Sequence, residues 1–246
     1  MRVVSLCPSL TETLFDLGRG ATLVGRTKFC VRPHGLIDAV ERVGGTKNPR
    51  IERIEALAPD LVLMNEEENR REDAEALAAR GLRVLSTFAR DVAGAAEALV
   101  TIGDAVDAAA EARSWAARID ERARQIVREA AERPRRRFVY LIWQKPWMAA
   151  APGTYIDALL TLAGGENAVA AGESRYPEVD GARLAAAELV LLSSEPFPFA
   201  ERHAQELSAE TGIARERLRL VDGELLSWHG TRTLAGLDYA AELLRA

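Results

Sequence analysis

The sequence predicts an α/β protein with two βα lobes, each built on a parallel central sheet, joined by one long rigid helix. Two observations predict this class. Short apolar runs alternate with helical segments in both halves of the chain, a rhythm typical of parallel sheets covered by helices. Between the halves, residues 104–133 have a different, strongly helical composition. We therefore expect an N-terminal lobe over residues 1–103, a bridging helix over 104–133 and a C-terminal lobe over 134–246.

The N-terminal half supports its lobe element by element. Apolar runs predict strands at residues 3–6, 23–25, 61–64 and 82–88, and helices are expected at 10–17, at 51–57 and between the polar stretch 65–73 and Gly81. Ser9 followed by Glu12 is the pattern of a capping box, so Ser9 is expected to cap the first helix. Gly18 and Gly81 stand where helices should stop.

The bridging segment is rich in Ala, Glu and Arg and contains no Gly or Pro over residues 104–132. Its apolar residues recur at helical spacing, and Pro134 ends the pattern. A helix of about 25 residues spans about 38 Å, enough to reach from one lobe to another.

The C-terminal half repeats the pattern of the first. A strand is expected at residues 138–143 and a helix at 155–162, which Gly164 and Gly165 should end. Residues 187–195 also echo residues 59–67, since each segment follows a helix rich in Ala and Leu and precedes another helix and strand. The two halves therefore read as related βα modules.

The composition excludes several classes of protein. The chain has 246 residues, 48% of them hydrophobic, with a formal net charge of −5, which is ordinary for a soluble globular protein. The densest basic run, residues 133–137, reads as a solvated connector, so no nucleic-acid partner is expected. No apolar stretch is long enough to span a bilayer, and we expect a monomer that is not membrane-embedded. Residues 1–8 do not form a signal peptide, which leaves a cytoplasmic and an exported protein both open.

Candidate binding residues follow the predicted strands, because ligands bind beyond the carboxyl ends of open parallel sheets. Three of the four tryptophans fall in such loops, where aromatic and cationic side chains gather. These side chains suit a large, partly apolar ligand with anionic or amide edges. The candidate ligand-binding residues are Lys28, Phe29, Cys30, Trp143, Trp147, Arg175, Tyr176, Trp228, His229 and Arg232.

Signatures of catalysis are missing. The chain has no Gly-x-Ser-x-Gly, no Walker loop and no Gly-x-Gly-x-x-Gly. We therefore predict no catalytic residue, no cofactor and no enzyme activity. Cys7, Cys30, His34 and His229 could converge as a soft metal site or a Cys–His nucleophile, but their spacing matches no metal motif and we predict no bound metal.

Four segments resemble the solute-binding proteins of metal-chelate ABC importers, a family that includes receptors for cobalamin (vitamin B12), ferric siderophores and haem. They are residues 3–12, with Pro8-Ser9-x-Thr11-Glu12; residues 43–45; residues 54–62, with Leu-x-Pro-Asp-Leu-Val; and Gly-Gly-Glu-Asn at 164–167. The resemblance covers nearly the whole chain and is strongest to the cobalamin branch.

The resemblance implies a ligand cleft between two lobes and capture of a metal chelate, most of all a corrinoid, with a ferric siderophore or haem as the alternative. It also implies a periplasmic location and one glutamate on each lobe that docks on the membrane permease; Glu67 and Glu195 are the candidates from the internal echo. The acids at 66–68 can equally be a solvated helix start. A cytoplasmic protein that handles corrinoids or metals, with or without catalysis, is the remaining alternative.

Overall fold

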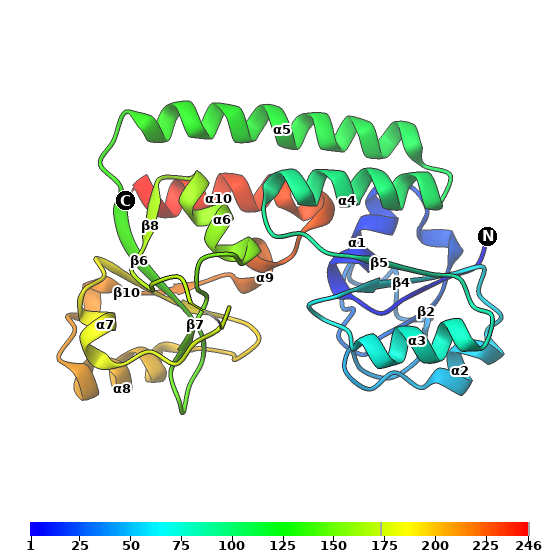
Figure 1. Ribbon diagram of the computed structural model, residues 1–246, viewed down its shortest axis with the longest axis horizontal. Helices are drawn as coiled ribbons and strands as arrows, with labels where there is room; N and C mark the ends of the chain where they lie inside the picture. The colour runs from blue at the N-terminus through cyan, green and yellow to red at the C-terminus, as the bar shows by residue number, and fades with distance from the viewer. Residues whose placement is uncertain (173, 246) are drawn as a thin grey trace. The chain divides into compact units, whose positions relative to one another are not determined.

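The computed structural model of the protein describes residues 1–172 and 174–245 and divides the chain into two compact units (Figure 1). Unit 1 is made of Met1–Ala89, Ala93–Ile119 and the short return segment His229–Arg232. Unit 2 is made of Arg90–Val92, Asp120–Trp228 and the C-terminal segment from Thr233. Each unit has its own sheet, and each is described by itself.

Unit 1 contains a five-stranded sheet in the order β3-β2-β1-β4-β5, with every pair parallel. Its strands are β1 (Val3–Ser5), β2 (Leu23–Arg26), β3 (Glu41–Arg42), β4 (Leu61–Asn65) and β5 (Val84–Thr87). The chain moves outward from β1 to β3 and then restarts on the other side of β1 with β4. The switch point, where ligands bind in doubly wound sheets, therefore lies at the carboxyl ends of β1 and β4.

The helices of unit 1 pack on this sheet because its central strands are buried on both faces. They are α1 (Pro8–Asp16), η1 (Gly20–Thr22), α2 (Ile51–Ala56), α3 (Arg71–Ala79), α4 (Val92–Ala105), α5 (Ala109–Ala131) and η3 (Gly230–Arg232). Two of them are divided between the units: Val92 of α4 and the part of α5 from Asp120 belong to unit 2. Val4, Val62 and Met64 of the sheet pack with Ile54 of α2 and Leu77 of α3 in one core cluster.

Two expectations about unit 1 are wrong in detail. Residue 104 belongs to α4, and α5 begins only at Ala109. The turn between these helices contains Asp107 at φ 58°, and an aspartate tolerates this left-handed conformation without any Gly or Pro to signal it. The predicted capping box does not form, because α1 starts at Pro8 and its N-cap residue, Cys7, makes no side-chain capping bond.

Unit 2 contains a sheet in the order β10-β9-β6-β7, with β8 paired to the first part of β6. Its strands are β6 (Arg136–Trp143), β7 (Met148–Ala149), β8 (Gly165–Asn167), β9 (Leu189–Ser193) and β10 (Leu218–Val221). All pairs are parallel except β6 with β7. The carboxyl ends of β6 and β9 form its switch point, since the chain leaves β6 for β7 and β8 on one side and returns to β9 on the other.

The remaining helices of unit 2 are α6 (Tyr155–Leu162), α7 (Gly181–Ala185), α8 (Glu201–Thr211), η2 (Arg215–Arg217), α9 (Gly223–Ser227) and α10 (Thr233–Arg245). The core joins the sheet to the surrounding helices, and Val139, Leu192 and Leu207 are among its fully buried members. Helix α6 ends at Leu162, two residues before Gly164, whose φ is 102°, so the predicted stop is confirmed.

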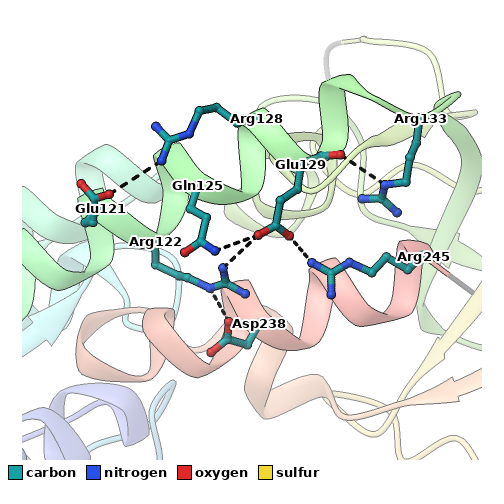
Figure 2. Close-up of polar contacts among 8 residues, drawn as sticks. All are labelled: Glu121, Arg122, Gln125, Arg128, Glu129, Arg133, Asp238 and Arg245. Atoms are coloured by element: carbon teal, nitrogen blue, oxygen red, sulfur yellow. Dashed lines mark hydrogen bonds and ion pairs between the residues drawn. The ribbon is translucent and has the colours of Figure 1, made fainter.

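The second part of α5 is attached to α10 by polar contacts within unit 2 (Figure 2). Arg122 of α5 bonds Asp238 of α10 at 2.5 Å, and Glu129 of α5 pairs with Arg245 of α10. Gln125 also donates to Glu129, at 2.9 Å. Glu129 thus collects contacts from its own helix and from the C-terminal one.

The predicted α/β class with parallel central sheets is confirmed. The predicted strands and helices are present within a few residues, apart from the start of α5, which lies at Ala109 and not at residue 104. The sequence analysis did not expect β3, β7, β8, α4, α9 or α10, whereas the helix expected before residue 187 is α7. The three strands and α9 carry too few residues for a periodic pattern, whereas α4 and α10 are long enough and were missed. No helix among the described residues is long and apolar enough to cross a membrane.

Candidate ligand-binding site

The switch point of unit 1 is occupied by two buried asparagines whose side chains are fully engaged. Asn65, the last residue of β4, donates from Nδ2 to the carbonyl of Thr87 and accepts at Oδ1 from the amides of Glu67 and Glu68. Asn69 donates to the carbonyls of Leu6 and Thr46, both at 3.0 Å. Buried polar groups are stable only when they are bonded in this way. This end of the sheet is therefore a fixed polar network.

His229 joins this network from the far end of the chain. Its Nε2 lies 2.9 Å from Asn65 Nδ2. Since Asn65 Nδ2 can only donate, Nε2 must accept, and the proton of the neutral ring lies on Nδ1. Desolvation by burial lowers the pKa of His229 to about 4, so the ring is neutral at pH 7. The candidate His229 therefore has a buried role within unit 1.

The return segment is attached to α1 by three further contacts in unit 1. Arg232 donates from Nε to Glu12 at 2.6 Å and also contacts the second carboxylate oxygen, in a bidentate pair whose side chains are only 13% and 16% exposed. Thr231 donates to Asp16 at 2.6 Å and to Thr13 Oγ1 from its amide. Thus Glu12, the expected capping residue, is instead the partner of Arg232.

The loop after β2 presents two of its three candidates to solvent. Phe29 is 50% exposed, and the Lys28 ammonium lies 4.9 Å from the centre of its ring, a cation–π distance. Cys30 is fully buried, with its Sγ 3.2 Å from Thr27 Oγ1. Lys28 and Phe29 can reach a ligand at the surface of unit 1, whereas the Cys30 thiol faces the interior.

The alternatives based on the cysteines find no support in the structure. Cys7 and Cys30 are both buried and not joined by a disulfide. Burial raises the pKa of both thiols, and a thiol that stays protonated is a poor nucleophile or metal ligand. His34 is exposed while His229 is buried. Within the described ranges, no three His, Cys, Asp or Glu residues are grouped to hold a metal ion.

The switch point of unit 2 is aromatic instead of polar. Trp143 ends β6 and is 42% exposed, and its ring meets Phe197, from the loop after β9, edge to face at 5.4 Å between centroids. Phe197 contacts Phe199 at 4.7 Å, and Phe199 stacks with Trp147 at 6.1 Å. The ring of His203 in α8 contacts both phenylalanines edge to face, at 5.1 Å from Phe197 and 5.8 Å from Phe199 between centroids. These five residues form what we call the aromatic cluster of unit 2.

The aromatic cluster is partly exposed, with the ring of Trp143 open to solvent. Phe199 and His203 are buried, while Trp147 and Phe197 are half-buried. Gln144, next to Trp143, donates to Glu206 of α8 at 3.0 Å and holds the start of the loop. Ring faces held this way can stack on a large planar molecule at little entropic cost. The sequence analysis selected Trp143 and Trp147 but left Phe197, Phe199 and His203 out of the candidate set.

The other candidates in unit 2 are dispersed. Arg175 is exposed, Tyr176 is half-buried, and their loop is held by a bond of 2.9 Å from the amide of Ala151 to the carbonyl of Arg175. Trp228 follows α9 and is only 7% exposed. Trp228 therefore lacks the open ring face that Trp143 has.

Glu67 and Glu195 have matching local structures in the two units. Each lies two residues beyond the end of a central strand, β4 or β9, and each is half-buried. In each case the polar last residue of the strand accepts from the glutamate amide, Asn65 Oδ1 at 3.0 Å and Ser193 Oγ at 3.3 Å. The Glu195 carboxylate also accepts from Ser227 at 2.7 Å. The internal echo in the sequence thus corresponds to a repeated strand–turn geometry.

Curated relatives match over most of the chain. The vitamin B12-binding protein of Vibrio campbellii is 25% identical over 203 residues, covering 82% of this chain and 71% of that protein. The protein of the same name from Vibrio cholerae serotype O1 is 24% identical over 255 residues, covering 99% and 89%.

Solved structures have the same fold. The periplasmic vitamin B12 binding protein BtuF of Vibrio cholerae superposes with a TM-score of 0.83 at 21% identity, covering 99% of this chain and 96% of that one. The periplasmic heme-binding protein BhuT, in complex with two hemes, gives 0.83 at 25% identity with the same coverage. The family model described as periplasmic binding protein matches residues 3–194. With that match over most of its length, the chain belongs to the periplasmic binding protein family and is a solute-binding protein.

Proposed function

We propose that the protein captures a metal chelate, in the first place a corrinoid of the cobalamin type, and delivers it to an ABC importer without transforming it. The single observation that carries this is the aromatic cluster at the switch point of unit 2, with the exposed ring of Trp143. A corrin or porphyrin presents a broad apolar face that suits such rings. The relatives named as vitamin B12-binding proteins favour the corrinoid.

Charged side chains are further ligand contacts in the proposal. Lys28 and Arg175 are exposed on their units and are suited to the amide or carboxylate edges of a chelate. We keep Phe29, Trp147 and Tyr176 as further contacts. Cys30, Trp228, His229 and Arg232 are buried or already paired within their units, so their proposed part is to support the residues that touch the ligand.

Haem is the second candidate ligand. It is favoured by BhuT, whose 25% identity extends over 99% of this chain. Haem carries two carboxylates, which Lys28 and Arg175 would also meet, so the aromatic cluster by itself does not discriminate the two macrocycles.

Titration with cyanocobalamin, haemin and a ferric catecholate siderophore tests the proposal. Binding is measured by the absorbance of each chelate and by quenching of tryptophan fluorescence, with free tryptophan as the inner-filter control. We expect saturable binding of cyanocobalamin at micromolar concentration. Tighter binding of haemin would replace the corrinoid with haem, and no saturable signal with any chelate would refute capture.

Docking to the permease belongs to the same proposal. We propose that Glu67 and Glu195 each pair with an arginine of the permease, since carboxylate–arginine pairs give both charge and geometric specificity. What supports it is the repeated strand–turn geometry, which holds the two acids in the same way on each unit.

A further inference from the structure

A surface cavity of unit 1 collects positive charge. It has a volume of about 490 Å³ and lies beside the edge strand β3. Lys28, Arg42, Arg50 and Arg53 line it, against the two acids Asp38 and Glu41. Glu41 is already paired with Arg53. In a chain whose net charge is −5, four cations in one cavity are a marked local excess.

Three of these cations have no carboxylate partner. Lys28 lies over the ring of Phe29, and within residues 1–172 and 174–245 no acid stands within ion-pair distance of Lys28, Arg42 or Arg50. Cations placed together in this way repel one another. The arrangement costs free energy that a bound anion would recover.

A buried arginine next to the cavity adds to the positive charge there. Arg26 of β2 is 2% exposed and stands in register with Arg42 on the adjacent strand β3. Among the residues that the structure describes, its guanidinium donates only to main-chain carbonyls, those of Ile37, Thr27 and Cys30. Like charges opposite one another on neighbouring strands are destabilising. Burial, and then the like charge of Arg42, lower the pKa of Arg26, against a smaller opposing effect of Asp38.

The backbone fixes the position of these cations. Gly44 has φ 113°, and a Cβ there would lie 2.7 Å from the carbonyl oxygen of Asn48. This tight turn brings Arg50 back alongside β3, where its amide donates to Val43 at 2.7 Å. Arg53 follows one helical turn later, with its amide bonded to the carbonyl of Arg50. Two elements and one turn thus hold three arginines around one cavity.

From this arrangement we infer that the cavity binds a multiply charged oxyanion, a phosphate group, at a site separate from the aromatic cluster. Guanidinium groups bind phosphate oxygens in pairs of parallel hydrogen bonds, and Arg42 and Arg50 supply two such groups. The Lys28 ammonium adds a third, point-like charge. The phosphate can be an inorganic ion or part of an ester. The inference goes beyond chelate capture and does not depend on it.

Calorimetric titration with inorganic phosphate and with adenosine monophosphate, at constant ionic strength, tests this site. The protein is purified without phosphate or sulfate. We expect saturable binding that the double variant Arg42→Gln/Arg50→Gln weakens at least about tenfold, since each lost charge-assisted bond is worth that much or more. Arg83→Gln, which removes another exposed arginine of unit 1, is the matched control and should bind as the wild type does. Lys28 is not varied because it is also a candidate for the chelate.

The outcomes are distinct. Binding of inorganic phosphate alone identifies a site for the free ion, and tighter binding of the nucleotide identifies an ester site. If neither phosphate nor nucleotide binds, or if Arg83→Gln loses as much affinity as the double variant, the inference is overturned.

A second readout does not depend on the ligand. Relief of repulsion should raise the urea midpoint of Arg42→Gln in phosphate-free buffer, and a lower midpoint would contradict the charge argument. Cyanocobalamin titration of the double variant separates this result from the proposed function, because chelate binding should be unchanged.

Discussion

Asn65 and His229 are 164 positions apart in the chain and share a hydrogen bond of 2.9 Å inside unit 1. The asparagine ends a central strand, and the histidine opens the segment by which the chain returns from unit 2. The bond requires a neutral imidazole that accepts at Nε2. The charge state of one histidine is thereby coupled to the attachment of the return segment.

Acid should destabilise unit 1 through His229. The pKa of this ring is lowered by burial from an ordinary 6.5 to about 4, so between these values the unfolded chain binds the proton and the folded one does not. Stability is then highest above pH 6.5 and falls as the pH is lowered toward 4, by about 3 kcal/mol in all. Urea unfolding at pH 7 and pH 5 measures this. His229→Gln should lose most of the dependence, whereas His34→Gln, at an exposed histidine, should keep it. Equal slopes in the wild type and His229→Gln would contradict the assignment.

The Glu12–Arg232 pair should stabilise the protein far more than an exposed pair does. Glu12→Gln leaves the guanidinium of Arg232 without its carboxylate in a site where both side chains are mostly buried, so we expect a loss of about 2–3 kcal/mol. Glu41→Gln breaks the more exposed pair with Arg53 and should cost less than about 1 kcal/mol. Chemical denaturation at neutral pH compares the two variants. Similar losses in both would refute a special role for the buried pair.

Trp143 should be the principal aromatic anchor of the chelate. Trp143→Ala removes the exposed ring of the aromatic cluster and should weaken cyanocobalamin binding by about 1–3 kcal/mol. Trp228→Ala tests the residue chosen from the sequence, and it should act mainly through stability because its ring is 7% exposed. Trp115→Phe, on α5, controls for the loss of one fluorophore. Unchanged affinity in Trp143→Ala, measured by the absorbance of the bound chelate, would move the site away from the cluster.

Charge reversal at the two candidate docking acids should uncouple the protein from its permease. Glu67→Lys together with Glu195→Lys would place cations opposite permease arginines, so stimulation of ATP hydrolysis in the reconstituted importer should be lost while chelate binding persists. The control is the double variant Glu66→Lys/Glu216→Lys, which makes the same change in net charge at two other positions. If the first pair stimulates as well as the wild type does, Glu67 and Glu195 are not docking residues.

The contacts of Glu129 should make the attachment of α10 to α5 sensitive to acid and salt. Burial opposes ionisation, but the bond from Gln125 and the charges of Arg245 and Arg122 together lower the pKa of Glu129. Its contribution to stability is present above the ordinary pKa near 4.5 and is lost as the pH falls through the lowered value. At pH 7, Glu129→Gln should unfold at a lower urea concentration than the wild type does. This difference between the two proteins should be smaller at pH 3 and in 1 M salt. Glu121→Gln should change little, because its partners Arg124 and Arg128 lie on the same helix. Figure 2 shows the pair with Arg128.

The sequence predicted those site residues whose type is unusual at their position. Trp143 and Trp147 were found because tryptophans in loops contradict the usual rule that large rings lie inside elements. Phe197 and Phe199 also follow a strand but were not chosen as candidates, and His203 carries no such signal because it is an ordinary helical residue by its neighbours. Glu12 was interpreted as a capping residue because the local pattern fits, and only its partner 220 residues away shows the actual role.

The sequence by itself determined the α/β class, most of the strands, the long helix and the repeated strand–turn segments that carry Glu67 and Glu195. These follow from local periodicity and turn chemistry, which a few neighbouring residues encode. Only the tertiary structure decided that His229 and Arg232 belong to unit 1, that the aromatic cluster is assembled from the end of β6, the loops after β6 and β9 and helix α8, and that Arg26 and Arg42 stand side by side. Such pairings join residues remote in the chain, and burial and register, not local pattern, determine which of them meet.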